Sequence, residues 1–161
     1  MWYFHRMTPF RKIDPVLLGE RLPEMVERLS AFPEVAAIWL FGSVARGRPR
    51  ATSDVDIAVF TVPGARRRDP LRQLEYVGAA SKALGTDRLD VVILNFAPVT
   101  LRHEVFRHGK LLFRRDDAGL ARFREASMRE YEDTAPLRRA LREAYFLRIR
   151  ENGFARRPAH R

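Results

Sequence analysis

The sequence contains no cysteine and no long apolar run. The absence of cysteine excludes disulfide scaffolds and thiolate metal sites, and it suits a reducing cytosol. No segment approaches the roughly 20 consecutive apolar residues that a membrane-spanning helix needs. The first ten residues, MWYFHRMTPF, lack the apolar stretch of a secretory signal peptide. We therefore expect a cytoplasmic protein that does not engage a membrane.

Acidic residues are the minority among the charged side chains. Asp and Glu number 20 against 30 Lys and Arg, which gives a formal net charge of +10. Such an excess favours anionic partners: nucleotide phosphates, nucleic acid or an acidic protein surface. The base composition of a GC-rich genome, which loads a surface with arginine, explains the charge equally well. The sequence has no aromatic and basic motif of an RNA-binding module, so direct nucleic-acid binding is not predicted.

The composition is that of a folded protein with a core of its own. Hydrophobic residues make up 46% and charged residues 31% of the chain, as in globular rather than disordered proteins. A length of 161 residues fits one domain. We divide the chain into an N-terminal extension (1–14), one domain (15–150) and a basic tail (151–161).

Hydrophobic periodicity predicts alternating helices and strands. A first helix is expected from Pro15 to Leu29, with a turn or a break into two short helices at Pro23. Pro136 divides or kinks a long C-terminal helical segment. Together these elements predict one α/β domain with a helical C-terminal third. The predicted strands are 35–41, 54–60, 89–94 and 110–115, and the further helices are 71–84, 98–108 and 116–150.

Two aspartates stand one residue apart in the second predicted strand, within SDVDIAVF. Residues i and i+2 of a strand face the same side, so Asp54 and Asp56 project together, about 7 Å apart at the backbone. Two carboxylates on one face repel each other unless a cation lies between them, and hard carboxylate oxygens suit Mg²⁺. Alternatively, the pair lies at an exposed strand end, in solvent or beside Arg46, Arg48 or Arg50.

A Gly-Ser pair follows the first predicted strand, ten residues before the aspartates. Gly42 allows a tight turn and a close approach of the backbone to a ligand. Ser43 can cap a short helix, and the N–H groups at such a helix start can bind phosphate. Arg46 lies in the same turn, within reach of a bound polyphosphate. The alternative for Gly-Ser is a simple turn.

A third carboxylate, Asp90, opens the apolar run LDVVIL. A two-metal site for nucleotidyl transfer needs such a group, which binds the metal beside the attacking hydroxyl or accepts its proton. Asp87, in the preceding turn, is a weaker rival for this role. The structural alternative is that Asp90 lies at a strand edge and pairs with Arg88.

The form GSVARG…SDVDIAV, followed by a lone aspartate that opens a later strand, resembles the DNA polymerase β-like nucleotidyltransferase superfamily and its minimal nucleotidyltransferases. Residues 97–136 are also similar to the C-terminal segment of minimal nucleotidyltransferases paired with HEPN-domain proteins. The resemblance covers roughly residues 20–148. It implies the nucleotidyltransferase fold, an α/β (α+β) arrangement in which a mixed sheet of about four strands is flanked by helices.

The resemblance also implies a function for each motif residue. Gly42 and Ser43 are expected to hold nucleotide phosphates, and Asp54 and Asp56 to bind two Mg²⁺ ions. Asp90 is expected to complete the metal site and to act as general base. The paired systems use ATP to place AMP on a tyrosine hydroxyl of a HEPN ribonuclease toxin, so an antitoxin in a hetero-oligomer is expected.

Two other functions remain open at this stage. One is transfer of the nucleotide to a small hydroxyl compound, as in aminoglycoside-modifying relatives, although the chain has little room for a second substrate-binding domain. The other is an antitoxin that neutralises its toxin by contact alone, although all three carboxylates are retained.

Overall fold

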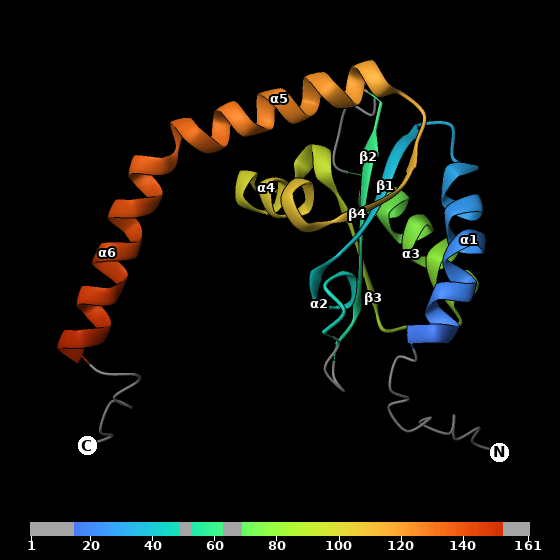
Figure 1. Cartoon of the computed structure of the whole chain (residues 1–161), viewed down its shortest axis with the longest axis horizontal. Helices are drawn as coiled ribbons and strands as arrows, with labels where there is room; N and C mark the ends of the chain where they lie inside the picture. Colours follow the sequence, from blue (N-terminus) through green and yellow to red (C-terminus); the bar gives the residue numbers. More distant parts are fainter. Residues whose placement is uncertain (1–14, 49–52, 63–68, 153–161) are drawn as a thin grey trace.

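A mixed four-stranded sheet lies at the centre of the molecule (Figure 1). The computed structural model describes residues 15–48, 53–62 and 69–152. The strands are β1 (Val35–Phe41), β2 (Val55–Thr61), β3 (Leu89–Ile93) and β4 (Lys110–Arg114). Their order is β3-β2-β1-β4, with β1 antiparallel to both β2 and β4 and with β2 parallel to β3. The predicted mixed sheet of about four strands is confirmed.

The two parallel strands are joined by helix α3 (Pro70–Leu84). The helix begins where the Asp69 side chain accepts a hydrogen bond from the N–H of Leu71, 2.9 Å away. It ends at Gly85, whose φ of 65° lies in the left-handed region that favours glycine. A parallel pair needs such a crossover. As a result, β2 and β3 begin at the same end of the sheet.

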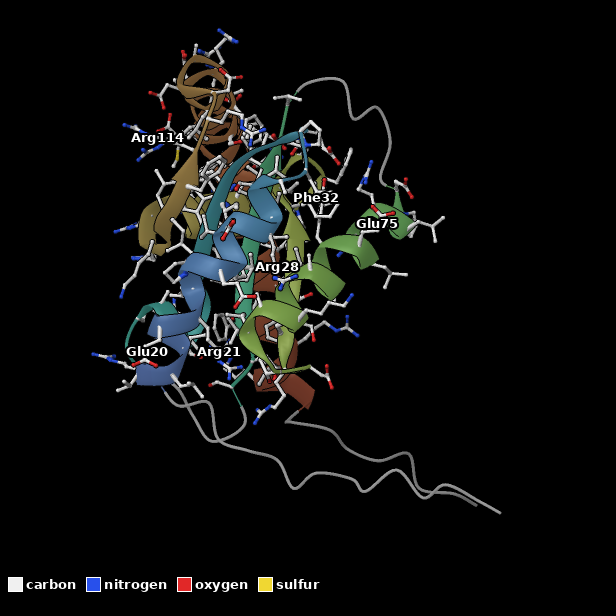
Figure 2. The ribbon with its side chains drawn as sticks, turned by 90° about the vertical axis from the view of Figure 1, so that its right-hand side faces the viewer. Glu20, Arg21, Arg28, Phe32, Glu75 and Arg114 are labelled. Atoms are coloured by element: carbon white, nitrogen blue, oxygen red, sulfur yellow. The ribbon has the colours of Figure 1, made fainter. Side chains whose placement is uncertain are left out.

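One face of the sheet is covered by α3 and by α1 (Pro15–Ser30), which lie side by side in both views (Figures 1 and 2). Helix α1 continues through Pro23, so the predicted break there is wrong. A proline inside a helix costs about 3 kcal/mol relative to alanine. The same helix buries Met25 and Leu29 completely, and each such burial contributes about 1.5–3 kcal/mol. Tertiary packing therefore outweighs the local cost of the proline.

The opposite face is covered by helices α4 (Val99–His108) and α5 (Asp117–Asp133). Alternation along β1 explains the two layers, because Ile38 packs with the α1 and α3 side while Trp39 packs with the α4 and α5 side. Phe60 stacks on Phe123 of α5 with ring centroids 4.6 Å apart. Both faces of the sheet are thus buried, which leaves its edges and strand ends for a functional site.

Helix α6 (Ala135–Asn152) follows α5 after Thr134 and extends away from the sheet (Figure 1). Thr134 ends α5, and its hydroxyl donates a hydrogen bond to the carbonyl oxygen of Glu130, 2.8 Å away. The C-terminal third therefore consists of two helices. Pro136 lies in the first turn of α6, where its missing N–H is tolerated.

The predicted element boundaries hold to within one or two residues, apart from the continuous α1. Strand β3 ends one residue early because Leu94 starts a short 3-10 helix, Leu94–Phe96. The predicted extension, residues 1–14, and most of the predicted tail lie outside the described residues. Among the helices that the structure describes, none is both long and apolar enough to cross a membrane.

Candidate active site

Two of the predicted carboxylates are direct neighbours in the sheet. In the parallel pair of β2 and β3, Asp56 is in register with Asp90. On the other side of β2, Asp56 is in register with Phe41, the last residue of β1. Gly42 therefore lies beside Asp56, and a Cβ atom at Gly42 would overlap the carboxylate of Asp56. Sheet register brings residues from three segments together at one end of the strands.

The carboxyl group of Asp56 is influenced by three neighbouring charged residues. Its pKa is raised above the ordinary value of 3.8, first by partial burial and then by the negative charges of Asp90 and Asp54. The positive charge of Arg46 acts in the opposite direction and lowers the pKa. The carboxylate cluster, defined as Asp54, Asp56 and Asp90, thus accumulates negative charge that a cation would relieve.

Asp54 is the outermost member of the carboxylate cluster. It immediately precedes β2, and its side chain is 56% exposed. The guanidinium Nε of Arg88 lies 3.3 Å from Asp54 Oδ1, and Arg88 Nη2 also donates to the backbone oxygen of Ser53 at 3.0 Å. Arg88, the alternative partner of Asp90 considered above, thus pairs with Asp54.

The Gly-Ser turn forms the short helix α2 (Gly42–Ala45). Gly42 has a φ of 72°, which an L side chain rarely adopts. Ser43 lies inside α2, so the prediction that it caps this helix is wrong, because Phe41 occupies the capping position. The Ser43 hydroxyl instead lies 2.9 Å from the hydroxyl of Ser53. This bond ties the turn to the segment that leads into the aspartates.

Two residues near the site were not predicted to lie there. Ser53 directly precedes the two aspartates, and a hydroxyl beside an Asp-x-Asp pair is the local signal that was available. Glu104 on α4 forms an ion pair with Arg46, with 2.5 Å between Oε1 and Nη1. The two partners are 58 residues apart, so no local pattern predicts their contact.

The donor chemistry at the cluster fits a hard divalent cation. Carboxylate oxygens are the ligands that Mg²⁺ prefers, and Asp56 and Asp90 stand side by side with mutually unfavourable charge. Within residues 15–48, 53–62 and 69–152, no group of three or more His, Asp or Glu residues forms a ready-made metal site. The third carboxylate is the one held by Arg88. Asp56 and Asp90 are thus adjacent in the sheet, whereas Asp54 is engaged in an ion pair with Arg88.

The family described as Polymerase beta, Nucleotidyltransferase matches residues 24–118. This match spans more than half of the chain and includes the Gly-Ser turn and all three carboxylates. The chain belongs to this family. It is a nucleotidyltransferase, and the mixed sheet with flanking helices is the fold of that family.

Two solved structures contain chains that are similar to this nucleotidyltransferase. A toxin–antitoxin complex with AMP-PNP contains a chain that is 25% identical, with a TM-score of 0.63 over 79% of this chain and 97% of that one. A mutant of the MntA–HpeT toxin–antitoxin pair gives 25% identity and a TM-score of 0.63 over 80% of this chain and 97% of that chain. No curated protein matches the nucleotidyltransferase significantly.

A third structure supports the fold alone. It holds a tri-AMPylated HEPN toxin of Shewanella oneidensis in complex with an MNT antitoxin. Its matching chain is 23% identical to this nucleotidyltransferase, with a TM-score of 0.60 over 83% of this chain and 99% of that one. The likeness in fold therefore extends beyond the sheet, because it covers nearly the whole of the matching chain.

Proposed function

We propose that this nucleotidyltransferase moves AMP from ATP to a tyrosine hydroxyl of a HEPN ribonuclease toxin and thereby acts as the antitoxin. The observation that carries the proposal is the pair Asp56 and Asp90, in register beside the Gly42 turn, in a chain that is similar along most of its length to part of a toxin–antitoxin complex with AMP-PNP. The proposal joins a site suited to nucleotidyl transfer with relatives whose partner is a toxin.

Mg²⁺ is the cofactor that the site chemistry supports. Asp56 and Asp90 would hold it, and Asp54 would join them after leaving Arg88, in keeping with the two ions expected in such sites. Asp54 is the exposed partner of its ion pair with Arg88, at 56% against 19%, so its carboxylate can turn toward a cation while Arg88 keeps its bond to the backbone oxygen of Ser53. Bound Mg²⁺ supplies charge neutralisation of the triphosphate and of the leaving pyrophosphate, and it acidifies the acceptor hydroxyl.

The turn after β1 is suited to hold the nucleotide phosphates. Gly42 has no side chain, and the carboxylate of Asp56 occupies the space that a Cβ atom would take, so the turn lies directly against the carboxylate cluster. Ser43 offers a hydroxyl from the same turn, and Arg46 offers a guanidinium that is about half exposed, at 49%. Phosphates bound here would lie next to the carboxylate cluster.

The transfer itself exchanges one P–O bond for another. The tyrosine oxygen attacks the α-phosphorus of ATP, the bond from that phosphorus to the bridging oxygen of the β-phosphate breaks, and pyrophosphate leaves. Asp90 is the member of the cluster suited to take the tyrosine proton, because it is exposed near the beginning of the edge strand β3, where a protein acceptor can approach. Asp56 is more enclosed and suits a role as metal ligand.

Helix α6 offers a surface for the toxin partner. Its apolar residues recur at helical spacing, yet they are exposed rather than buried in the core. An apolar stripe of this kind, bordered by arginines, is typical of a protein interface. The exposed residues are Leu137 (61%), Leu141 (61%), Tyr145 (60%), Phe146 (61%) and Leu147 (47%).

The double variant Leu137→Glu and Leu141→Glu is expected to weaken the complex with the HEPN protein by about tenfold or more, because both leucines would present charge to an apolar interface. Its melting temperature should stay close to that of the wild type, since neither leucine is in the core. Light scattering and titration calorimetry with the purified partner measure the effect. Arg139→Gln, an exposed change on the same helix, is the matched control and should bind normally. Unchanged binding of the double variant would exclude this face.

The proposed activity is tested with ATP labelled on the α-phosphate, Mg²⁺ and the purified HEPN protein. We expect label on the HEPN protein, lost on chelation of Mg²⁺ and absent when the label is on the γ-phosphate, because AMP rather than phosphate is transferred. Mass spectrometry of the labelled protein should locate the AMP on tyrosine. A stable complex without label would instead indicate an antitoxin that acts by contact, and label on an added small hydroxyl compound alone would indicate a small-molecule acceptor.

A further inference from the structure

Glu104 on α4 holds the tip of the Arg46 side chain at the edge of the proposed nucleotide site. Glu104 Oε1 lies 2.5 Å from Arg46 Nη1, and the two side chains are 39% and 49% exposed. Neither the carboxylate cluster nor the metal chemistry uses Glu104. The contact nevertheless links α4 to the turn that follows β1, and it does so through the one arginine proposed to bind phosphate.

The backbone of this turn fixes the other end of the Arg46 side chain. Arg46 ends α2, and its N–H donates to the carbonyl oxygen of Gly42 at 3.4 Å. The next residues continue the turn, with Gly47 bonded to Val44 at 3.0 Å and Arg48 bonded to Ser43 at 3.0 Å. Arg46 is therefore held at the backbone by the turn and at the guanidinium by Glu104. An arginine held in this way loses less rotamer freedom when it binds an anion.

The guanidinium of Arg46 lies close enough to Asp56 to act on it electrostatically while it is paired with Glu104. In this position its charge lowers the pKa of Asp56, against the effects of burial and of the neighbouring aspartates. A guanidinium carries five N–H donors in a planar fork, and the contact with Glu104 involves Nη1. Arg46 can therefore face a phosphate beside Asp56 without leaving Glu104, so the ion pair supports phosphate binding rather than competing with it.

Helix α4 is a rigid support for Glu104. The residue after it, Val105, is completely buried. The residue before it, His103, stacks on Tyr131 of α5, with ring centroids 3.7 Å apart and planes 6° from parallel. His108 lies on the other side of the carboxylate, with 3.9 Å between Nε2 and Glu104 Oε2. Contacts on both sides thus limit the positions that Glu104 can take.

We propose that Glu104 is a positioning residue that orients Arg46 toward the phosphates of bound ATP. The inference rests on the proposed function, because it assumes that ATP binds at the turn after β1. It assigns a role in nucleotide binding to α4, a helix that contributes no residue to the carboxylate cluster.

The test measures binding of α,β-methylene-ATP with Mg²⁺ by calorimetry, because this analogue cannot transfer AMP. Glu104→Gln is expected to weaken binding about fivefold, the effect of losing one ordered exposed ion pair. In the Arg46→Ala background, Glu104→Gln should have no further effect, because Glu104 acts through Arg46. In turnover with ATP, KM should rise by the same factor while kcat is retained. Glu104→Asp should recover part of the affinity by restoring the charge.

Glu130→Gln is the matched control, because Glu130 of α5 pairs with Arg102 of α4 at 2.8 Å and is not part of the contact with Arg46. Its affinity for the analogue should equal that of the wild type. Unchanged or tighter binding by Glu104→Gln, with weaker binding by Arg46→Ala, would overturn the positioning role and leave the proposed function standing. Absence of binding by the wild type would overturn both.

Discussion

Asp56→Asn is expected to lower AMP transfer by roughly 1,000-fold or more while the protein remains folded. A metal ion contributes several kcal/mol of transition-state stabilisation, and each factor of ten in rate corresponds to about 1.4 kcal/mol. Asp56 is central to the cluster, since it is in register with Asp90 and lies beside Gly42. Its loss should therefore remove the metal ion together with its chemistry. Label transfer from ATP to the HEPN protein measures the effect.

The same substitution is expected to raise the melting temperature at neutral pH when divalent ions are removed. Because the folded-state pKa of Asp56 is raised above 3.8, the folded protein binds this proton more tightly than the unfolded chain does. Stability contributed by the protonated form is therefore lost as the pH rises from about 3.8 through the raised pKa, and asparagine avoids that loss.

Thermal unfolding in the presence of a chelator, measured from acidic to neutral pH, tests whether Asp56→Asn raises the melting temperature. The difference between Asp56→Asn and wild type should grow as the pH rises and vanish near the pKa of an exposed aspartate. Asp117→Asn is the control, since Asp117 is exposed and lies outside the carboxylate cluster. Retained transfer by Asp56→Asn would contradict the site. A variant that melts at a lower temperature than wild type at neutral pH would contradict the electrostatic account.

Gly42→Ala is expected to abolish transfer almost as completely as the loss of Asp56. The added Cβ would overlap the Asp56 carboxylate and force it out of its place beside Asp90. In addition, a φ of 72° is unfavourable for alanine by about 1–2 kcal/mol. We therefore expect both a large loss of metal-dependent transfer and a lower melting temperature.

Gly47→Ala separates these two effects. Gly47 has a similar φ of 68°, but a Cβ there meets no atom within 4 Å. Gly47→Ala should thus lose about the same stability from backbone strain while it keeps most of its activity. Equal losses of activity in both variants would mean that the strained turn matters and the space beside Asp56 does not.

The central elements of the site were predictable because they depend on local patterns. The apolar runs of β1 and β2 predict the strands, and a Gly-Ser pair after one strand with Asp-x-Asp in the next indicates the carboxylates. Asp56 lies beside Asp90 because β2 and β3 pair in parallel and begin at the same end of the sheet. The spacing in the sequence identifies these residues, whereas the pairing of the strands in the sheet makes them neighbours.

The contacts between distant segments were not predictable. Arg46 contacts Glu104 over 58 residues, and Arg88 contacts Asp54 over 34 residues. Several arginines near the turn were equally plausible partners, and only the fold selects among them. The continuity of α1 through Pro23 was also not predictable, because it depends on the burial of Met25 and Leu29 against other parts of the protein. Periodicity predicted α6 as a helix but did not decide whether its apolar side lies in the core or forms a partner surface; the structure leaves that side exposed.

The most direct test of the account is the position of Mn²⁺ in a crystal of the protein grown with α,β-methylene-ATP. Anomalous scattering locates Mn²⁺ without assumptions about the ligands. The account predicts Mn²⁺ between the carboxylates of Asp56 and Asp90, with Asp54 turned from Arg88 toward the ion and the phosphates on the Gly42 turn. Nucleotide bound on the turn without Mn²⁺ at Asp56, or Mn²⁺ bound only elsewhere, would contradict it.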